Sequence, residues 1–105
     1  MHARVITIQL QPEMIDEAIR IYQDAMPEVK QQQGVRELLL FVDRKTGKCI
    51  SVALWDTEAV VQGTQTSGQF QRFLARGDDV MAEPPVVEYY ELAAHELAEG
   101  AAGSV

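Results

Sequence analysis

The sequence is poor in the residues that catalytic and metal sites most often use. Its 105 residues include two histidines, His2 and His95, and a single cysteine, Cys49. No HxH, CxxC or HxxxH spacing, glycine-rich phosphate loop or Ser-His-acid set is found, so we expect neither a metal nor a cofactor. A lone cysteine excludes an internal disulfide and favours a reducing compartment. Cys49 is interpreted as a small buried strand residue.

Basic residues are also scarce, with 9 Lys and Arg against 16 Asp and Glu, for a net charge of −7. Nucleic acid and anionic membrane surfaces would be repelled, so neither is expected as a partner. The N-terminal residues lack the pattern of a signal peptide, and no apolar run approaches the ~20 residues that span a bilayer. The expectation is one soluble, cytoplasmic domain.

What the sequence does contain is clear periodicity. Alternation of apolar residues predicts strands, and apolar residues at helical spacing predict helices. Pro12 suits the first turn of a helix and Gly34 its end, whereas Gly63 is expected to interrupt the second helical region, which restarts at Ser67-Gly68. The predicted strands are residues 3–10, 35–43, 48–56 and 86–93.

The resulting order is β-α-β-β-α-β. This order predicts an α+β, ferredoxin-like domain with a four-stranded antiparallel sheet and both helices on one face. The domain is expected to cover residues 1–93. Residues 94–105 are small and polar and are expected to form a mobile tail.

Both faces of the predicted sheet are apolar, although two helices can cover only one. Leu39 and Phe41 alternate with Leu38 and Leu40, and Tyr90 opposes Tyr89 on the last strand. An uncovered apolar face is an association site. We therefore expect an obligate homodimer in which two copies pack sheet to sheet.

The face that carries the only tryptophan is lined by small residues. Alternation along residues 48–56 puts Cys49, Ser51, Ala53 and Trp55 on one side. Small side chains beneath helices that contain glycine are expected to leave free volume. Trp55 is then interpreted as the wall of a hollow. The alternative is that Trp55 packs in the core with its N–H bonded to a backbone carbonyl. Tyr22 is on the apolar side of the first helix, and its hydroxyl is a candidate to reach this hollow.

Three motifs resemble those of the antibiotic biosynthesis monooxygenase family, of the dimeric α+β barrel superfamily. They are "LWDTEA" at the tryptophan, "SGQF" about a dozen residues later, and "MPEVKQQQGV" before the second strand. The resemblance covers residues 3–93. It implies two sheets closed into a dimeric α/β barrel, with a pocket between each sheet and its own helices, and it supports fold better than activity.

The resemblance also implies site residues. Trp55 matches the pocket tryptophan of the polyketide-oxidising members, while Ser51 and Val61 stand where those members have asparagine and tyrosine. Arg72 or Arg76 matches their helical arginine. The haem-degrading members require a tryptophan and a histidine that would fall near Thr64 and Leu74 of this chain. The quinol-oxidising members have a histidine about where Gln69 stands. This chain has neither pattern.

Two functions remain open at this point. The resemblance implies a cofactor-independent monooxygenase acting on a small aromatic or quinol-like compound, with an arginine stabilising the substrate anion. The alternative is a dimer that binds or senses a small apolar or aromatic ligand without chemistry. A dimerisation module with a filled core is a third interpretation, which predicts no cavity near Trp55.

Overall fold

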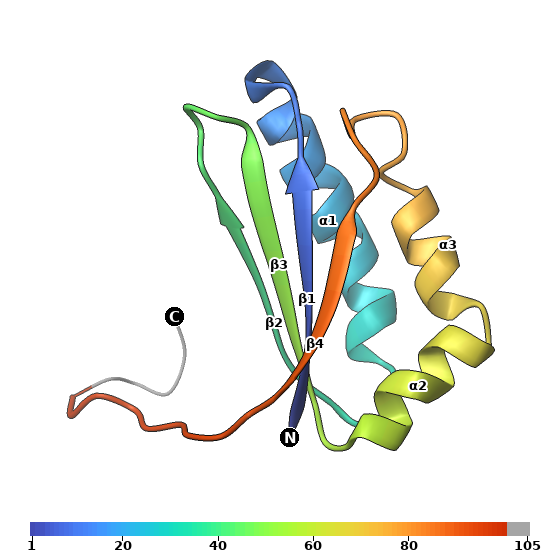
Figure 1. The fold of residues 1–105 in the computed structure, drawn as a ribbon, viewed down its shortest axis with the longest axis vertical. Helices are drawn as coiled ribbons and strands as arrows, with labels where there is room; N and C mark the ends of the chain where they lie inside the picture. The colour runs from blue at the N-terminus through green and yellow to red at the C-terminus, as the bar shows by residue number, and fades with distance from the viewer. Residues whose placement is uncertain (101–105) are drawn as a thin grey trace.

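The computed structural model describes residues 1–100, except for the side chains of residues 65 and 69. The expected mobile tail lies partly beyond these, since residues 101–105 are outside the described part. Residues 94–100 have no helix or strand and extend away from the sheet (Figure 1). The elements are β1 (His2–Gln9), η1 (Pro12–Met14), α1 (Ile15–Lys30), β2 (Val35–Val42), β3 (Lys48–Trp55), α2 (Glu58–Thr66), α3 (Gln69–Ala75) and β4 (Val86–Glu91).

The four strands form one antiparallel sheet in the order β2-β3-β1-β4, as Figure 1 shows. This arrangement confirms the predicted ferredoxin-like α+β fold. The register pairs Arg4 of β1 with Ala53 of β3 on one side and with Tyr89 of β4 on the other. Residues from three strands therefore meet around position 4, at the middle of the sheet.

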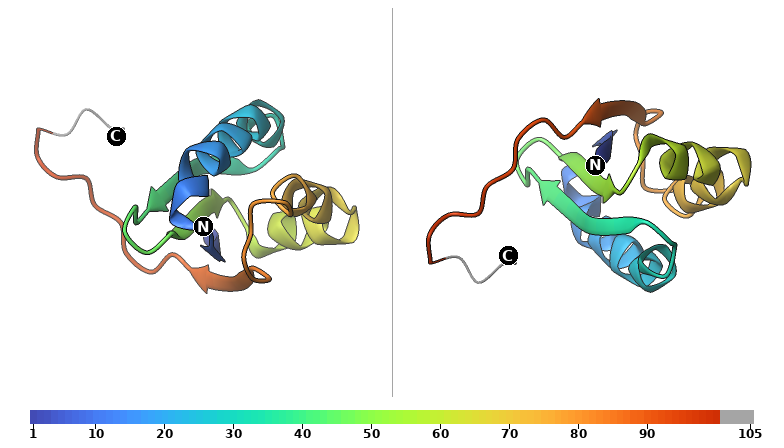
Figure 2. Two further views of the ribbon diagram at one scale, coloured as in Figure 1. Left: turned by 90° about the horizontal axis from the view of Figure 1, so that it is seen from above. Right: turned by 90° about the horizontal axis from the view of Figure 1, so that it is seen from below.

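The helices lie on one face of the sheet, as the two views along the strands show (Figure 2). The core on this face is built around Leu10, Ile15, Cys49 and Val80. Each burial removes apolar surface from water, which is the dominant stabilising effect in a domain of this size. No helix within residues 1–100 has the length and apolar character needed to cross a bilayer.

The second helical region differs from the expectation at one glycine. Helix α2 continues through Gly63, so the predicted interruption there is wrong: an isolated glycine lowers helix stability without ending the helix. The break comes at Gly68, which has φ of 81° and precedes α3. This left-handed residue turns the chain so that α3 starts in a new direction.

A second positive-φ glycine lets α2 approach the start of β2. Gly34 has φ of 91°, and a Cβ at this position would lie 2.8 Å from Cγ1 of Val60. Its carbonyl accepts a hydrogen bond of 2.8 Å from the N–H of Asp56. Gly34 therefore positions the strand end that carries Trp55.

The face away from the helices is apolar, as alternation along the strands predicts. Phe41, Val86 and Tyr90 are 55%, 56% and 51% exposed. Within a single chain the sheet is open, not closed into a barrel. Closure into the dimeric barrel would need a second copy of the chain.

Candidate functional site

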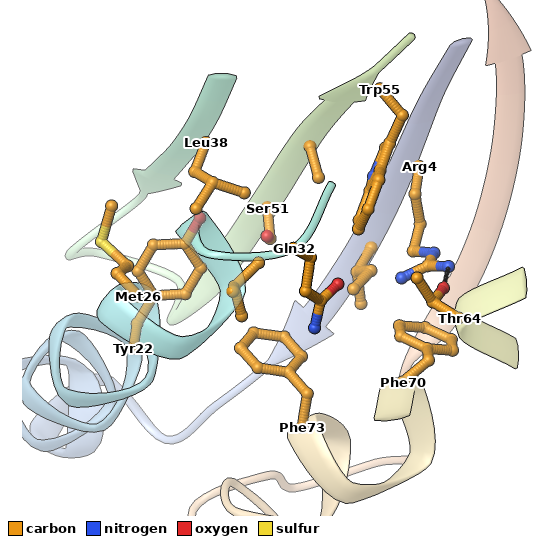
Figure 3. A pocket seen from close by; sticks show the side chains of 13 residues that line it. Arg4, Tyr22, Met26, Gln32, Leu38, Ser51, Trp55, Thr64, Phe70 and Phe73 are labelled. Atoms are coloured by element: carbon orange, nitrogen blue, oxygen red, sulfur yellow. Dashed lines mark hydrogen bonds between the residues drawn. The ribbon is translucent and has the colours of Figure 1, made fainter. Parts of the chain in front are cut away.

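Arg4 lies on the helix-covered face, where its neighbours on β1 are apolar. Arg4 and Ile6 are two residues apart on β1, so their side chains are on the same face of the sheet. The Arg4 side chain lies between the sheet and the residues of α2 and α3 (Figure 3). Only 5% of the residue is exposed. A charged side chain is rarely buried this far unless it is paired, so its partners decide what the site can do.

Two hydrogen bonds hold one end of the Arg4 guanidinium against α2. Nη2 donates to the carbonyl oxygen of Val61 at 3.1 Å and to Oγ1 of Thr64. The Thr64 hydroxyl in turn donates to the same carbonyl at 2.7 Å. Because these partners belong to one helical turn, they fix the guanidinium in orientation as well as position.

Aromatic rings surround the guanidinium on its remaining sides. Its Cζ lies 3.8 Å from the ring centroid of Phe70, 5.6 Å from that of Trp55 and 5.8 Å from that of Tyr89. A desolvated cation–π contact contributes about 2 kcal/mol. The cage therefore compensates part of the desolvation of Arg4 without neutralising its charge.

Two buried N–H groups at this site lack an acceptor. Nε of Arg4 and Nε1 of Trp55 have no hydrogen-bond partner, and none of the ion pairs formed within residues 1–100 includes Arg4. Desolvation lowers the pKa of Arg4, while the charge interaction and hydrogen bond of the Tyr89 phenol act in the opposite direction. The guanidinium remains protonated at neutral pH.

The guanidinium and the indole border a cavity of about 40 Å³ between the sheet and the helices (Figure 3). This volume holds about three water molecules. Thirteen residues line it: Arg4, Ile6, Tyr22, Met26, Val29, Gln32, Leu38, Ser51, Ala53, Trp55, Thr64, Phe70 and Phe73. We call this the arginine cavity.

Four of the residues suggested by the sequence line the arginine cavity, namely Trp55, Ser51, Ala53 and Tyr22. Trp55 is 1% exposed, and no backbone carbonyl accepts its indole N–H, in contrast to a satisfied core tryptophan. The Tyr22 hydroxyl donates to the carbonyl of Leu39 at 3.3 Å. Burial raises the pKa of Tyr22, and a hydrogen bond with Ser51 partly offsets this increase.

The other three suggested residues lie elsewhere. Val61 contributes its carbonyl to Arg4, but it lines a separate surface hollow with Tyr89. Arg72 and Arg76 line a small hollow between α1 and α3, outside the arginine cavity, and Arg76 pairs there with Glu28. Phe73 and Gln32 border both this hollow and the arginine cavity, and they lie between the cavity and the two helical arginines.

Sequence reasoning missed Arg4, although a signal was present. Arg4 shares its face with Ile6, Ile8 and Leu10, and an arginine on the apolar side of a strand needs buried partners. Phe70 is a buried core residue, and its ring also lies against the guanidinium. No cluster of three or more His, Cys, Asp or Glu side chains suited to a metal ion occurs within the part of the chain that the structure describes.

The fold is shared with several solved proteins. One described as an antibiotic biosynthesis monooxygenase superposes with a TM-score of 0.71 at 19% identity, covering 90% of this chain and 100% of that one. A protein of unknown function from Nitrosomonas europaea gives 0.74 at 19% identity, covering 94% and 95%. At these identities the likeness concerns the fold alone.

Sequence comparison finds relatives and a family. An uncharacterized protein of Mycobacterium tuberculosis is 34% identical over 106 residues, which cover 96% of this chain and 46% of the relative. The chain thus spans about half the length of the curated relatives it matches. The profile described as antibiotic biosynthesis monooxygenase matches residues 1–76. With most of the domain matched and the fold shared, the chain belongs to the antibiotic biosynthesis monooxygenase family.

Proposed function

We propose that this protein is a cofactor-independent monooxygenase that acts on a small aromatic or quinol-like compound. The observation that carries the proposal is the arginine cavity, which is bordered by aromatic side chains and one buried cation. Membership of the family supports the reaction class. In this proposal Trp55, Ser51, Ala53 and Tyr22 contact the substrate.

The proposed reaction needs little from the protein because the substrate supplies the electrons. A phenol with a free para position and one O₂ give a quinone and one water. The ionised ring transfers electrons to O₂, a C–O bond forms at the para carbon, and the O–O bond breaks as water leaves. The protein's contribution is to hold the ring, exclude bulk water and stabilise the anion.

Side chains of the arginine cavity match these three tasks. Trp55, Phe70 and Phe73 are aromatic residues of the cavity lining that would contact a planar substrate. The substrate enters as the anion, and Arg4 stabilises its charge in a site of low dielectric constant. Arg72 lies in the neighbouring hollow between α1 and α3, where its positive charge favours the approach of an anionic substrate. Arg76 is paired there with Glu28.

Oxygen consumption by the purified protein with a panel of hydroxyquinols and anthrone-like phenols tests the proposal. We expect consumption of one O₂ per quinone formed, in the presence of a chelator. Trp55→Phe and Arg4→Met should each lower kcat/KM by about tenfold or more, and Arg20→Met, which removes an exposed charge paired with Glu17, should not. Turnover that is indifferent to both cavity variants would contradict the proposal.

A second candidate function is a dimer that binds a small aromatic ligand without chemistry. The observation that favours it is the absence of a carboxylate or imidazole base: none of the described side chains lining the arginine cavity is an aspartate, glutamate or histidine. A ligand that raises the melting temperature while no product or oxygen consumption appears would support this function over the first.

We also propose that two copies associate through the uncovered face of the sheet. Phe41, Val86 and Tyr90 are exposed there, and the family is generally dimeric. Sedimentation velocity should give a dimer at micromolar concentration. Phe41→Asp should give monomers, because a charge would be buried at the interface, whereas Leu97→Asp, beyond the last strand, should not. A monomeric wild-type protein would refute the association.

A further inference from the structure

We propose that this protein binds dioxygen in a second cavity, separate from the arginine cavity. The second cavity measures about 60 Å³ and lies between the sheet and helices α1 and α3, and we call it the apolar cavity. Of the described side chains that border it, none is charged. The role of the bound gas as a co-substrate rests on the proposed function, whereas the site itself is inferred from the cavity alone.

The first argument is that the wall of the apolar cavity offers little to a water molecule. Among the described side chains on this wall, those with a polar hydrogen are Tyr22 and Cys49. The Tyr22 hydroxyl is engaged by the Leu39 carbonyl and by Ser51, and the Cys49 thiol donates to the carbonyl of Gly47 at 3.9 Å. A buried water makes about three hydrogen bonds. The wall does not supply them, so the space favours an apolar molecule.

The second argument is the size of the apolar cavity. Its volume of about 60 Å³ exceeds the ~10–15 Å³ that one water molecule requires, so a diatomic gas fits without displacing a side chain. An aromatic ring requires much more space, since benzene binds in an apolar cavity of about 150 Å³. The volume therefore admits dioxygen and excludes the organic substrate.

The third argument is the chemistry of the atoms on the wall. Dioxygen has no dipole moment and is held by dispersion forces, which polarisable atoms strengthen. The sulfur atoms of Cys49 and Met81 and the rings of Tyr22 and Phe73 belong to residues that border the cavity. The thiol is compatible with dioxygen because burial raises the pKa of Cys49, and the neutral thiol is much less reactive than the thiolate.

The fourth argument is the position of the apolar cavity. Tyr22 and Phe73 border both cavities, so a gas molecule in the apolar cavity is one layer of side chains away from a substrate in the arginine cavity. The arginine cavity is a poorer site for the gas, because the unpartnered N–H groups of Arg4 and Trp55 favour water over an apolar molecule. With two sites, dioxygen and the organic substrate do not compete for the same space.

Methyl NMR under pressurised oxygen locates the gas without any turnover, because dioxygen is paramagnetic and accelerates the relaxation of nearby nuclei. Nitrogen at the same pressure gives the reference rates. Leu10 borders the apolar cavity, Ile6 borders the arginine cavity, and Ile15 borders neither, although all three are at most 3% exposed. We expect oxygen to accelerate relaxation of the Leu10 methyl groups about threefold or more beyond the effect at Ile15 and Ile6, because apolar surroundings favour the gas.

A pair of alanine variants tests whether the cavity itself holds the gas. Ala18 borders the apolar cavity from α1, and Ala18→Leu fills the space with a residue that favours helices. The oxygen effect at Leu10 should then fall to the level of Ile15. Ala75→Leu adds the same atoms at the exposed end of α3 and should leave the effect at Leu10 unchanged. Far-UV circular dichroism and thermal unfolding verify that each variant folds.

Steady-state kinetics test the role of the gas as a co-substrate in the proposed monooxygenase. Ala18→Leu should raise KM for dioxygen about threefold or more and change KM for the quinol by less than about twofold, because the two molecules occupy different cavities. Ala75→Leu should change neither constant. An unchanged KM for dioxygen in Ala18→Leu would overturn the co-substrate role.

Equal oxygen effects at Leu10, Ile15 and Ile6 in the wild-type protein would overturn the inference, and this comparison does not depend on any variant. A larger effect at Ile6 than at Leu10 would place the gas in the arginine cavity and overturn it as well. An effect concentrated at Leu10 without oxygen consumption on any quinol would leave the gas site standing and refute the monooxygenase. Oxygen consumption on quinols with no excess effect at Leu10 would do the reverse.

Discussion

Two hollows of similar size lie under the same helices, and they differ in chemistry. The arginine cavity measures about 40 Å³ and the second about 60 Å³. The second, the apolar cavity, is lined by Ile8, Leu10, Ala18, Tyr22, Leu40, Cys49, Phe73, Leu74, Gly77, Val80 and Met81. Tyr22 and Phe73 border both and form the partition between them, with ring centroids 6.2 Å apart in an edge-to-face arrangement.

The two cavities differ in what their side chains contribute to stability. The apolar cavity lies inside the core cluster of Leu10, Ile15, Cys49 and Val80, where burial stabilises the fold. The arginine cavity has a buried charge and two unused donors, which lower stability. Functional sites commonly retain such unfavourable groups because a ligand satisfies them.

The largest predicted effect is at the apolar end. Leu10 is 2% exposed within the core cluster, so Leu10→Ala should lower the free energy of unfolding by about 2–5 kcal/mol. Leu97, which is 57% exposed, provides the matched control, and Leu97→Ala should stay within about 0.5 kcal/mol. Urea unfolding measures both. A small loss at Leu10 would mean that this cavity collapses freely and is not core.

At the arginine end the sign should reverse. Arg4→Met replaces a buried, unpaired cation with an apolar side chain of similar length, and the free energy of unfolding should rise by about 1 kcal/mol. Arg20→Met, at an exposed position, should change stability by less than about 0.5 kcal/mol. Chemical denaturation of the three proteins side by side makes the comparison. A fall of several kcal/mol for Arg4→Met would assign Arg4 to the stabilising core.

The two ends also differ in pH dependence. Burial raises the pKa of the Cys49 thiol above its ordinary value of 9.0, so the unfolded chain loses this proton first. Its contribution to stability is present below pH 9 and is lost as the pH rises through the folded-state pKa. Cys49→Ala should flatten the decline in unfolding free energy near pH 9. An unchanged slope would show that the thiol is accessible; the Arg4→Met variant should keep the wild-type slope.

The smallest effect is expected outside both cavities. Glu28 and Arg76 form an ion pair across the α1–α3 seam with side chains 65% and 44% exposed. Glu28→Gln should change the unfolding free energy by less than about 0.5 kcal/mol, because water and salt screen the pair. Thermal unfolding at low and high salt provides the measurement. A larger loss would indicate that the seam holds the helices together.

Most of the fold could be predicted from the sequence. Alternation in the strands and helical spacing around Ile15 and Ala18 report which side chains face the core, and the observed strand bounds differ from the predicted ones by one or two residues. The exception is Gly63. Whether a glycine ends a helix depends on packing and on the turn that follows, and here Gly68 provides that turn.

The site was less predictable for a physical reason. Trp55, Ser51 and Ala53 follow from strand parity, because one strand positions them. The contacts of Arg4 join β1 to Val61, Thr64 and Phe70, which are about 60 residues away. Side chains that meet only through tertiary structure leave no local periodicity, and resemblance directed attention to the helical arginines instead.

Trp55 is the chain's single tryptophan. It is buried, and its ring centroid lies 5.6 Å from Cζ of Arg4. Indole emission from this protein therefore originates at one known place, without contributions from other tryptophans. Its wavelength reports how polar that place is, and a ligand bound beside the indole would change the wavelength or the intensity. The molecule carries its own optical probe, so occupancy can be followed in real time without a label.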